Sequence, residues 1–416
     1  MSINQISTKV CIIGAGPAGL IIANILQKYS IPCVVIEKYS ESEIYERSRA
    51  GLVDHKTIAI LEKYNLGDRL LDRGQAHGKC EFRTPKNSLI IDYAQMSEGQ
   101  THYTYPQQEL LADLISQFYK HGGEILFNAE ASSIENNGHG ATKIESRQYG
   151  QDLVIDCDFV AGCDGFHGIS RQTIPESITQ PRYKKYDYAW LAITAEAAPS
   201  TEHIIYGIHP RGFAGHMLRT EKISRYYLQI PMTDTADDWS SDRIWSELQL
   251  RLAKPNWQLT EGTIIAKQVL NMRSYVARTM QHLNLFLAGD AAHIFTPAGG
   301  KGMNLAIQDG YVLGEAFISY YRHQENLPLK NYSKVRFSEI WQTQEFSESL
   351  LHMINIQDGN TAEGRSMQRL QQFKLAQMTN SEFYTKNFAR HYVGYTTTEN
   401  PKIVSSVTQS TFAVAS

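Results

Sequence analysis

The sequence is poor in cysteine, and its cysteines follow no disulfide or metal-ligand pattern. There are five among 416 residues, an odd number, and no CxxC pair occurs. This argues against a disulfide framework and favours reduced, structural cysteines in the cytoplasm. HExxH and paired ExxH motifs are also absent, so the sequence predicts no zinc or di-iron site and no other bound metal.

Strong net charge and a membrane-length apolar run are missing as well. The formal net charge is −3, which gives no reason to expect nucleic acid or an anionic membrane as a partner. The most apolar stretch, 10–26, is shorter than the roughly 20 residues of a membrane span, and glycines and a proline interrupt it. Residues 1–8 carry no positive cluster and no small-residue cleavage site follows, so we expect an unprocessed, cytoplasmic chain.

The length and the change of pattern along the chain predict two lobes. Residues 1–182 alternate apolar strands with helical segments, which predicts the first part of an α/β, Rossmann-like domain. Residues 183–275 change to alternating, aromatic-rich strands, which predicts an inserted, mainly antiparallel sheet domain. Residues 276–400 return to the first domain and add C-terminal helices. The Ser/Thr-rich segment 401–416 is expected to be a flexible tail.

Helical spacing marks the individual helices within these parts. Helices are predicted at 56–72, 106–121, 240–252, 302–323, 330–356 and 361–378.

The most informative motif lies near the N-terminus. An apolar strand runs into Gly14-x-Gly16-x-x-Gly19, and a second apolar strand ends in Glu37. Gly14 permits the tight turn, Gly16 lets backbone N–H groups approach a pyrophosphate, and Gly19 lets the helix pack closely on the strand. Glu37 is placed to accept hydrogen bonds from both hydroxyls of an unphosphorylated ribose. The pattern predicts a dinucleotide site.

Two distant motifs accompany the first. Cys163-Asp164-Gly165 closes one buried strand, and Ala288-Gly289-Asp290 closes another. An acid at the carboxyl end of a buried strand is where open α/β sheets place ligand contacts. No second GxGxxG and no GxxxxGK[ST] occurs, so the sequence offers no other nucleotide-binding domain.

Together and in this order, the three motifs resemble the FAD-binding pattern of the class A flavoprotein monooxygenases. The resemblance covers most of 8–395 and is most specific in 163–171, 206–227 and 290–304. It implies noncovalent FAD, NADH or NADPH as a co-substrate that docks at the surface, O₂, a small aromatic acid as substrate, and a homodimer.

The implied reaction is hydroxylation of 4-hydroxybenzoate at C3, to 3,4-dihydroxybenzoate, through a flavin hydroperoxide in aromatic catabolism. Two alternatives stay open: a related monooxygenase acting on another para-substituted benzoate, such as 4-aminobenzoate, and a non-catalytic flavin-binding protein.

The resemblance also implies which residues contact the cofactors. The FAD positions of the family are held here by Gly14, Gly16, Gly19, Glu37, Arg47, Arg49, Gln107, Asp164, Arg225, Asp290, Lys301, Gly302, Met303 and Asn304. The positions implied to contact the nicotinamide nucleotide are His167, Arg171, Arg273 and, again, Arg49.

The substrate residues follow from the same resemblance. Arg219 matches the bidentate partner of a benzoate carboxylate, with Tyr227 as a further hydrogen-bond partner. Tyr206 and Tyr392 match the tyrosines that carry the phenolic proton, and His77 matches the histidine that passes it to solvent.

Three more positions complete the implied site. Pro297 matches the proline whose carbonyl faces the substrate hydroxyl, and Asn304 matches a catalytic amide beside the flavin. Met217 stands where the family has a serine, which removes a hydroxyl donor and leaves the exact benzoate open.

Overall fold

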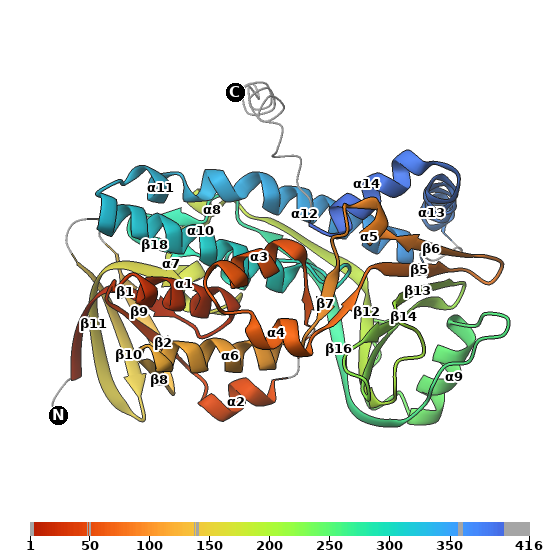
Figure 1. Cartoon of the computed structure of the whole chain (residues 1–416), viewed down its shortest axis with the longest axis horizontal. Coiled ribbons are helices and arrows are strands. Elements are labelled where there is room, and N and C mark those ends of the chain that lie inside the picture. Colours follow the sequence, from red (N-terminus) through yellow and green to blue (C-terminus); the bar gives the residue numbers. More distant parts are fainter. Residues whose placement is uncertain are drawn as a thin grey trace.

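The computed structural model describes residues 4–47, 49, 51–136, 138, 141–356 and 361–394. Two large sheets lie side by side, and long helices run across the top of both (Figure 1). The predicted tail, 401–416, lies outside the described residues. No helix in the part of the chain that the structure describes is long and apolar enough to cross a membrane.

The first sheet is the predicted Rossmann-like sheet. Its strands run in the order β17-β18-β11-β1-β2-β8, and β9 and β10 extend it from β11. β1 pairs in parallel with β2 and β11, and the next strands outward, β8 and β18, are also parallel. The bounds are β1 Asn4–Ile13, β2 Cys33–Glu37, β8 Ile125–Phe127, β9 Ala129–Glu135, β10 Thr142–Gln148, β11 Gln151–Gly162, β17 Gln281–His282 and β18 Leu285–Leu287.

Helix α1 (Pro17–Lys28) explains the apolar run at 10–26. Pro17 occupies the first helical turn, where its missing N–H costs nothing, and every residue from Ala18 to Leu26 is buried. The helix packs between α6 (Gln107–Lys120) and α10 (Gly302–His323) (Figure 1). A stretch hydrophobic on all sides is therefore a helix enclosed by protein.

The second sheet is the inserted, mainly antiparallel one. Its order is β19-β16-β12-β15-β14-β13-β5-β6, and only the β13–β5 pair is parallel. Strands β5 and β6 come from outside the predicted range 183–275. The bounds are β5 Lys79–Arg83, β6 Ser88–Asp92, β12 Arg182–Glu196, β13 Ile204–His209, β14 Gly212–Leu218, β15 Ser224–Pro231, β16 Thr263–Val276 and β19 His293–Ile294.

The two faces of the second sheet have separate cores. One face packs against α9 (Ser241–Arg251) through residues such as Trp245 and Leu248. The other packs against the C-terminal helices α12 (Tyr332–Ile354), α13 (Ala362–Asn380) and α14 (Glu382–Tyr392). The predicted fold class is confirmed: an α/β domain, an inserted sheet and a C-terminal helical region.

Two expectations about helices were wrong in detail. The single helix predicted at 56–72 is two helices, α3 (His55–Lys63) and α4 (Asp68–Arg73), because Asn65 adopts a left-handed φ of 58° between them. Helix α14 was not predicted, although it carries Tyr392.

The remaining elements are short. They are α2 Glu41–Glu46, α5 Tyr93–Met96, α7 Ile169–Thr173, α8 Glu176–Thr179, α11 Leu327–Lys330, the 3₁₀ turn Gly289–Ala291, and the small sheet of β3 Leu52–Val53, β7 His102–Thr104 and β4 Gln75–His77.

His216 on β14 gives the fold a pH dependence that one substitution should remove. Its Nε2 accepts the Ser200 N–H at 3.2 Å, and burial, followed by the charge of Arg83, lowers its pKa from 6.5 to about 3. In that pH interval the unfolded chain binds a proton that the folded chain excludes, so stability falls as the pH falls below 6.5. From pH 7 to pH 5, the wild type should lose about 2 kcal/mol more free energy of unfolding than His216→Gln.

Urea unfolding at both pH values measures the effect. His121→Gln, at the exposed end of α6, is the control and should behave as the wild type. Equal losses in the wild type and in His216→Gln would contradict the prediction.

Candidate active site

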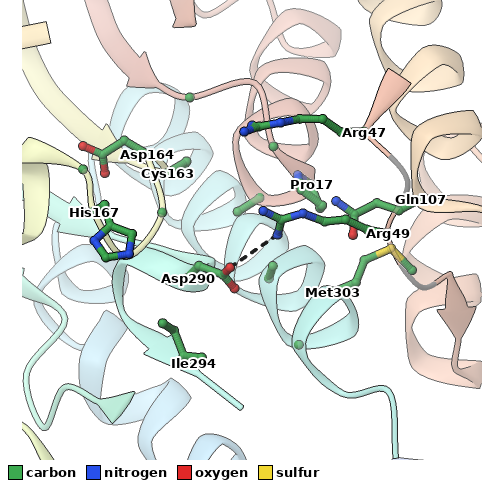
Figure 2. Close-up of a pocket in the computed structure, with 18 of the residues that line it drawn as sticks. Pro17, Arg47, Arg49, Gln107, Cys163, Asp164, His167, Asp290, Ile294 and Met303 are labelled. Atoms are coloured by element: carbon green, nitrogen blue, oxygen red, sulfur yellow. Dashed lines mark ion pairs between the residues drawn. The ribbon is translucent and has the colours of Figure 1, made fainter. Parts of the chain in front are cut away.

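A cleft of about 890 Å³ opens where the parallel strands of the first sheet end. The chain leaves β1 at Gly14, β2 after Glu37, β11 at Cys163 and β18 at Ala288, so all three sequence motifs meet at one edge. Figure 2 shows Asp164, His167 and Asp290 on one side of the cleft and Arg47, Arg49 and Gln107 on the other.

Most residues predicted to contact FAD line this cleft. They are Gly14, Gly16, Glu37, Arg47, Arg49, Gln107, Asp164, Arg225, Asp290, Lys301, Gly302 and Met303. Gly19 and Asn304 do not line it. Gly19 packs against the Gly14 carbonyl, and Asn304 bonds to the backbone of Asp54 and Leu52.

The glycines of the first motif are required by close backbone contacts. Gly14 has a φ of 106°, and a Cβ there would lie 2.5 Å from the carbonyl oxygen of Cys163. A Cβ on Gly19 would lie 2.1 Å from the carbonyl oxygen of Gly14. Side chains at either position would force the turn, the helix and β11 apart, so the glycines set the shape of the cleft.

Glu37 is held in a fixed orientation at the end of β2. Its Oε2 accepts the Ala15 N–H at 2.8 Å, and its Oε1 accepts the Tyr39 N–H at 3.0 Å. The side chain is buried but lines the cleft, and each carboxylate oxygen has a further lone pair besides the one that accepts a backbone N–H. The carboxylate can accept ribose hydroxyls without losing either backbone contact.

The other two acids differ in environment. Asp164 accepts the Ser170 N–H through Oδ2 at 2.9 Å, whereas its buried Oδ1 has no partner among the described residues. Burial raises its pKa. Asp290 is half-exposed and faces Arg49 across the cleft, with 3.6 Å between Oδ2 and Nη1 (Figure 2). Both acids therefore have acceptor capacity left for a ligand.

A smaller cavity of about 60 Å³ adjoins the cleft and belongs to the second sheet. Tyr206 and Tyr227 lie on either side of Gly215 in one cross-strand row, so both tyrosines project from the same face. Met217 and Pro297 also line the cavity. Gly215 has no side chain, and the Phe213 ring and the Met217 methyl group approach the position that its Cβ would take, at 2.9 and 3.3 Å.

Arg219 and Arg225 both line this small cavity, and Arg219 is the more deeply buried of the two. Its side chain is buried, and its guanidinium makes only long hydrogen bonds, to the Arg49 carbonyl at 3.4 Å and the Gln108 amide oxygen at 3.3 Å. It forms no ion pair with a carboxylate of the described residues, and burial, followed by the charge of Arg225, lowers its pKa. A buried cation without a counterion is costly, and a ligand carboxylate would compensate it.

The two tyrosines predicted to carry a proton are in direct contact. The hydroxyls of Tyr206 and Tyr392 lie 2.8 Å apart, and both side chains are buried, which raises both pKa values. His77 is also buried, and burial lowers its pKa to about 4. Tyr93 and His102 pack against Tyr392, and the Tyr93 hydroxyl bonds to Nδ1 of both His77 and His102. Sequence reasoning did not identify Tyr93 or His102, because they belong to no motif.

Lys301 and Asn304 sit at the start of α10. The Lys301 ammonium donates to the Tyr392 carbonyl, and burial lowers its pKa to about 8. The Asn304 amide is occupied: its oxygen accepts the Asp54 N–H at 2.9 Å, and its nitrogen donates to the carbonyls of Leu52 and Gly300. The predicted contact of Asn304 with the flavin stays a prediction.

Three of the four residues predicted to meet the nicotinamide nucleotide, His167, Arg171 and Arg273, surround Phe166, whereas Arg49 faces Asp290. The guanidinium carbons of Arg171 and Arg273 lie 4.4 and 4.7 Å from the Phe166 ring centre, and Arg273 is 3.3 Å from Nε2 of His167. Arg273 and His167 line the cleft, whereas Arg171 does not. This cluster presents positive charge at the cleft entrance, as an anionic dinucleotide requires.

The model of a known family, described as an FAD-binding domain, matches residues 7–347. A p-hydroxybenzoate hydroxylase of Acinetobacter baylyi is 33% identical over 93% of this chain and 95% of its own. The chain belongs to the FAD-binding flavoprotein monooxygenases. The prediction made from its three motifs is thereby confirmed.

Solved structures agree on the fold. A p-nitrophenol 4-monooxygenase from Pseudomonas putida has a TM-score of 0.80 at 17% identity, covering 94% of this chain and 99% of that one. An aklavinone-11 hydroxylase, in a ternary complex with FAD and aklavinone, has a TM-score of 0.70 at 18% identity, covering 85% of this chain and 70% of that one.

This flavoprotein is an aromatic monooxygenase that uses FAD, with NAD(P)H as its co-substrate. The cleft fits FAD: the turn at Gly14 admits a pyrophosphate, Glu37 suits a ribose, and the unpartnered Oδ1 of Asp164 needs a donor. No group of acids, histidines and cysteines arranged to hold a metal occurs among the described residues.

Asp290→Ala should raise the dissociation constant for FAD at least tenfold. A hydrogen bond to a charged group contributes about 1.5–3 kcal/mol, and each 1.4 kcal/mol is a factor of ten. Fluorescence titration of apoprotein with FAD measures the change. Asp158→Ala is the matched control, because Asp158 is similarly exposed and pairs with Lys9 far from the cleft. Equal FAD affinity in both variants would remove Asp290 from the cofactor site.

Proposed function

We propose that this monooxygenase hydroxylates 4-hydroxybenzoate at C3, giving 3,4-dihydroxybenzoate, with consumption of O₂ and NADH or NADPH. The single observation that carries the proposal is Arg219, a buried guanidinium without a carboxylate partner in the described chain, lining a cavity beside the FAD cleft. The relative from Acinetobacter baylyi, named for p-hydroxybenzoate, supports the choice of substrate.

In this proposal the substrate carboxylate binds Arg219. A guanidinium donates two parallel hydrogen bonds to a carboxylate, which sets orientation as well as affinity. Tyr227 accepts the Arg225 Nε–H at 3.0 Å, so its own hydroxyl proton remains available for the same carboxylate. Arg225 thereby connects the small cavity to the FAD cleft, both of which it lines.

The phenol end of the substrate then meets Tyr206. The contact with Tyr392 gives its proton an exit into the protein, and removal of the proton matters because a phenolate is the stronger nucleophile at the ring carbon. FAD bound in the cleft and reduced by NAD(P)H would activate O₂, of which one atom enters the ring and the other leaves as water. Pro297 lines both cavities, and in this proposal its carbonyl faces the substrate hydroxyl.

Met217 is the reason for considering a second candidate substrate. Its side chain lines the small cavity and offers no hydroxyl donor beside Arg219. Its methyl carbon lies 3.3 Å from the position that a Cβ of Gly215 would take, so it narrows the space that the missing side chain leaves. A para-substituted benzoate with a different polar group, such as 4-aminobenzoate, is therefore the alternative substrate.

The predicted domain boundaries, oligomeric state and cellular location are also part of this proposal. We propose an FAD domain at 1–182 and 276–400 with a substrate domain at 183–275, acting as a cytoplasmic homodimer. Strands β5 and β6 complete the substrate sheet from within the first segment.

Arg219→Met should weaken binding of 4-hydroxybenzoate at least a hundredfold. Removing one partner of a desolvated ion pair costs about 3–5 kcal/mol, which exceeds two decades at 1.4 kcal/mol each. Titration of the flavin absorbance gives the dissociation constants. 4-Hydroxybenzamide, which lacks the charge, is the matched ligand and should lose much less affinity. A change below threefold for the acid would place the carboxylate elsewhere.

Tyr206→Phe and Tyr392→Phe should keep FAD and NAD(P)H oxidation but form little hydroxylated product. Each variant interrupts proton removal, so the phenol of the bound substrate stays protonated. The electrons from NAD(P)H then reduce O₂ to hydrogen peroxide instead of driving hydroxylation. Chromatography of the product against peroxide formed measures the coupling. Tyr226→Phe, buried on the opposite face of the sheet, is the control. Wild-type coupling in the first two variants would remove the tyrosine pair from the mechanism.

A further inference from the structure

Two histidines face one another beside the tyrosine pair. His77 on β4 and His102 on β7 are directly paired across the antiparallel ladder, and their ring centres are 5.9 Å apart. Tyr93, the first residue of α5, reaches both: its hydroxyl lies 2.8 Å from Nδ1 of His77 and 3.1 Å from Nδ1 of His102. All three side chains are buried.

A close backbone contact brings Tyr93 to this position. The Ala94 N–H donates to the Gly78 carbonyl at 3.0 Å, and a Cβ on Gly78 would lie 2.5 Å from the Cβ of Ala94. The missing side chain lets α5 lie directly on the end of β4.

The three residues continue the line that Tyr206 and Tyr392 begin. The ring centres of Tyr93 and His102 both lie 5.0 Å from that of Tyr392, and the His102 ring is almost perpendicular to it. Hydrogen bonds thus join Tyr206 to Tyr392 and Tyr93 to the two histidines, and ring contacts of Tyr392 bring these two sets together in the buried core.

The hydrogen-bond count around Tyr93 leaves the proton positions open. Its hydroxyl has one proton and three neighbours that can accept it, namely the two Nδ1 atoms and the His77 carbonyl at 2.7 Å. At least one imidazole must therefore donate to Tyr93.

If His77 and His102 had a purely structural role, apolar side chains would stabilise this core better. The Nε2 atoms of His77 and His102 are buried and have no hydrogen-bond partner among the described residues, which costs stability. Burial lowers the pKa of His77 to about 4 and that of His102 further. Both rings are neutral near pH 7, and a neutral imidazole accepts a proton at one nitrogen while donating from the other.

We propose that His102 and Tyr93 carry the phenolic proton from Tyr392 to His77, an inference that rests on the proposed function. The substrate hydroxyl gives its proton to Tyr206 as Tyr206 gives its own to Tyr392. Tyr392 passes a proton through one water to Nε2 of His102, which has no direct partner among the described residues, as Nδ1 of His102 donates to Tyr93. Tyr93 then protonates Nδ1 of His77. The balance is a phenolate at one end, one added proton on His77, and no electron transferred.

Tyr93→Phe tests this, because it removes one hydroxyl and keeps the ring. Tyr188→Phe is the matched control: Tyr188 is buried in the same core, and its hydroxyl has no partner among the described residues. Stopped-flow absorbance follows ionisation of bound 4-hydroxybenzoate after mixing with the oxidised holoenzyme. We expect Tyr93→Phe to retain FAD, to bind substrate within about twofold of wild type, and to ionise it at least tenfold more slowly. Tyr188→Phe should match the wild type.

A second variant and the product assay make the outcomes distinct. His102→Gln should show the same slow ionisation, and it replaces Tyr93→Phe if that variant fails to fold. Ionisation at the wild-type rate in the folded variants overturns the relay while the wild type still forms 3,4-dihydroxybenzoate. A wild type that neither ionises 4-hydroxybenzoate nor forms this product overturns the proposed function and the relay with it.

Discussion

The whole site depends on the parallel pairing of β1 with β2 and β11. Parallel strands end at the same edge of a sheet, so residues that are far apart in sequence leave the sheet side by side. Gly14, Glu37 and Asp164 meet at this edge for that reason, and Asp290 joins them through β18. Bringing these residues together places the Gly14 turn so close to Cys163 that no side chain fits at position 14.

Buried polar side chains line the region where this edge of the first sheet meets the second sheet. Four side chains of this region are buried: Arg219, Lys301, Tyr206 and Tyr392. Burial lowers the pKa of the two cations and raises the pKa of the two tyrosines, so in each case it favours the neutral form. Such groups are expensive for the fold and useful in a hydroxylase, because they respond strongly to a ligand charge or to a moving proton. The core around them shields these groups from bulk water, which would weaken both effects.

Local patterns in the sequence were sufficient where a function needs a short, continuous motif. The GxGxxG turn, the two strand-ending acids and the helical spacing at 302–323 all predicted what the structure contains. Residues whose neighbours come from distant strands were beyond such patterns. Nothing near Tyr93 or His102 indicates that each lies against Tyr392, and β5 joins the second sheet only by pairing with β13.

The sequence by itself determined the cofactor class and the insertion of aromatic-rich strands between two parts of the first domain, because each follows from contiguous residues. Only the tertiary structure decided which charges remain without a partner and which hydroxyls touch. Arg219, directly after β14, is an arginine like others until packing removes it from water without a counterion. The contact between Tyr206 and Tyr392 likewise exists only because α14 folds back onto β13, a long-range event that no local spacing encodes.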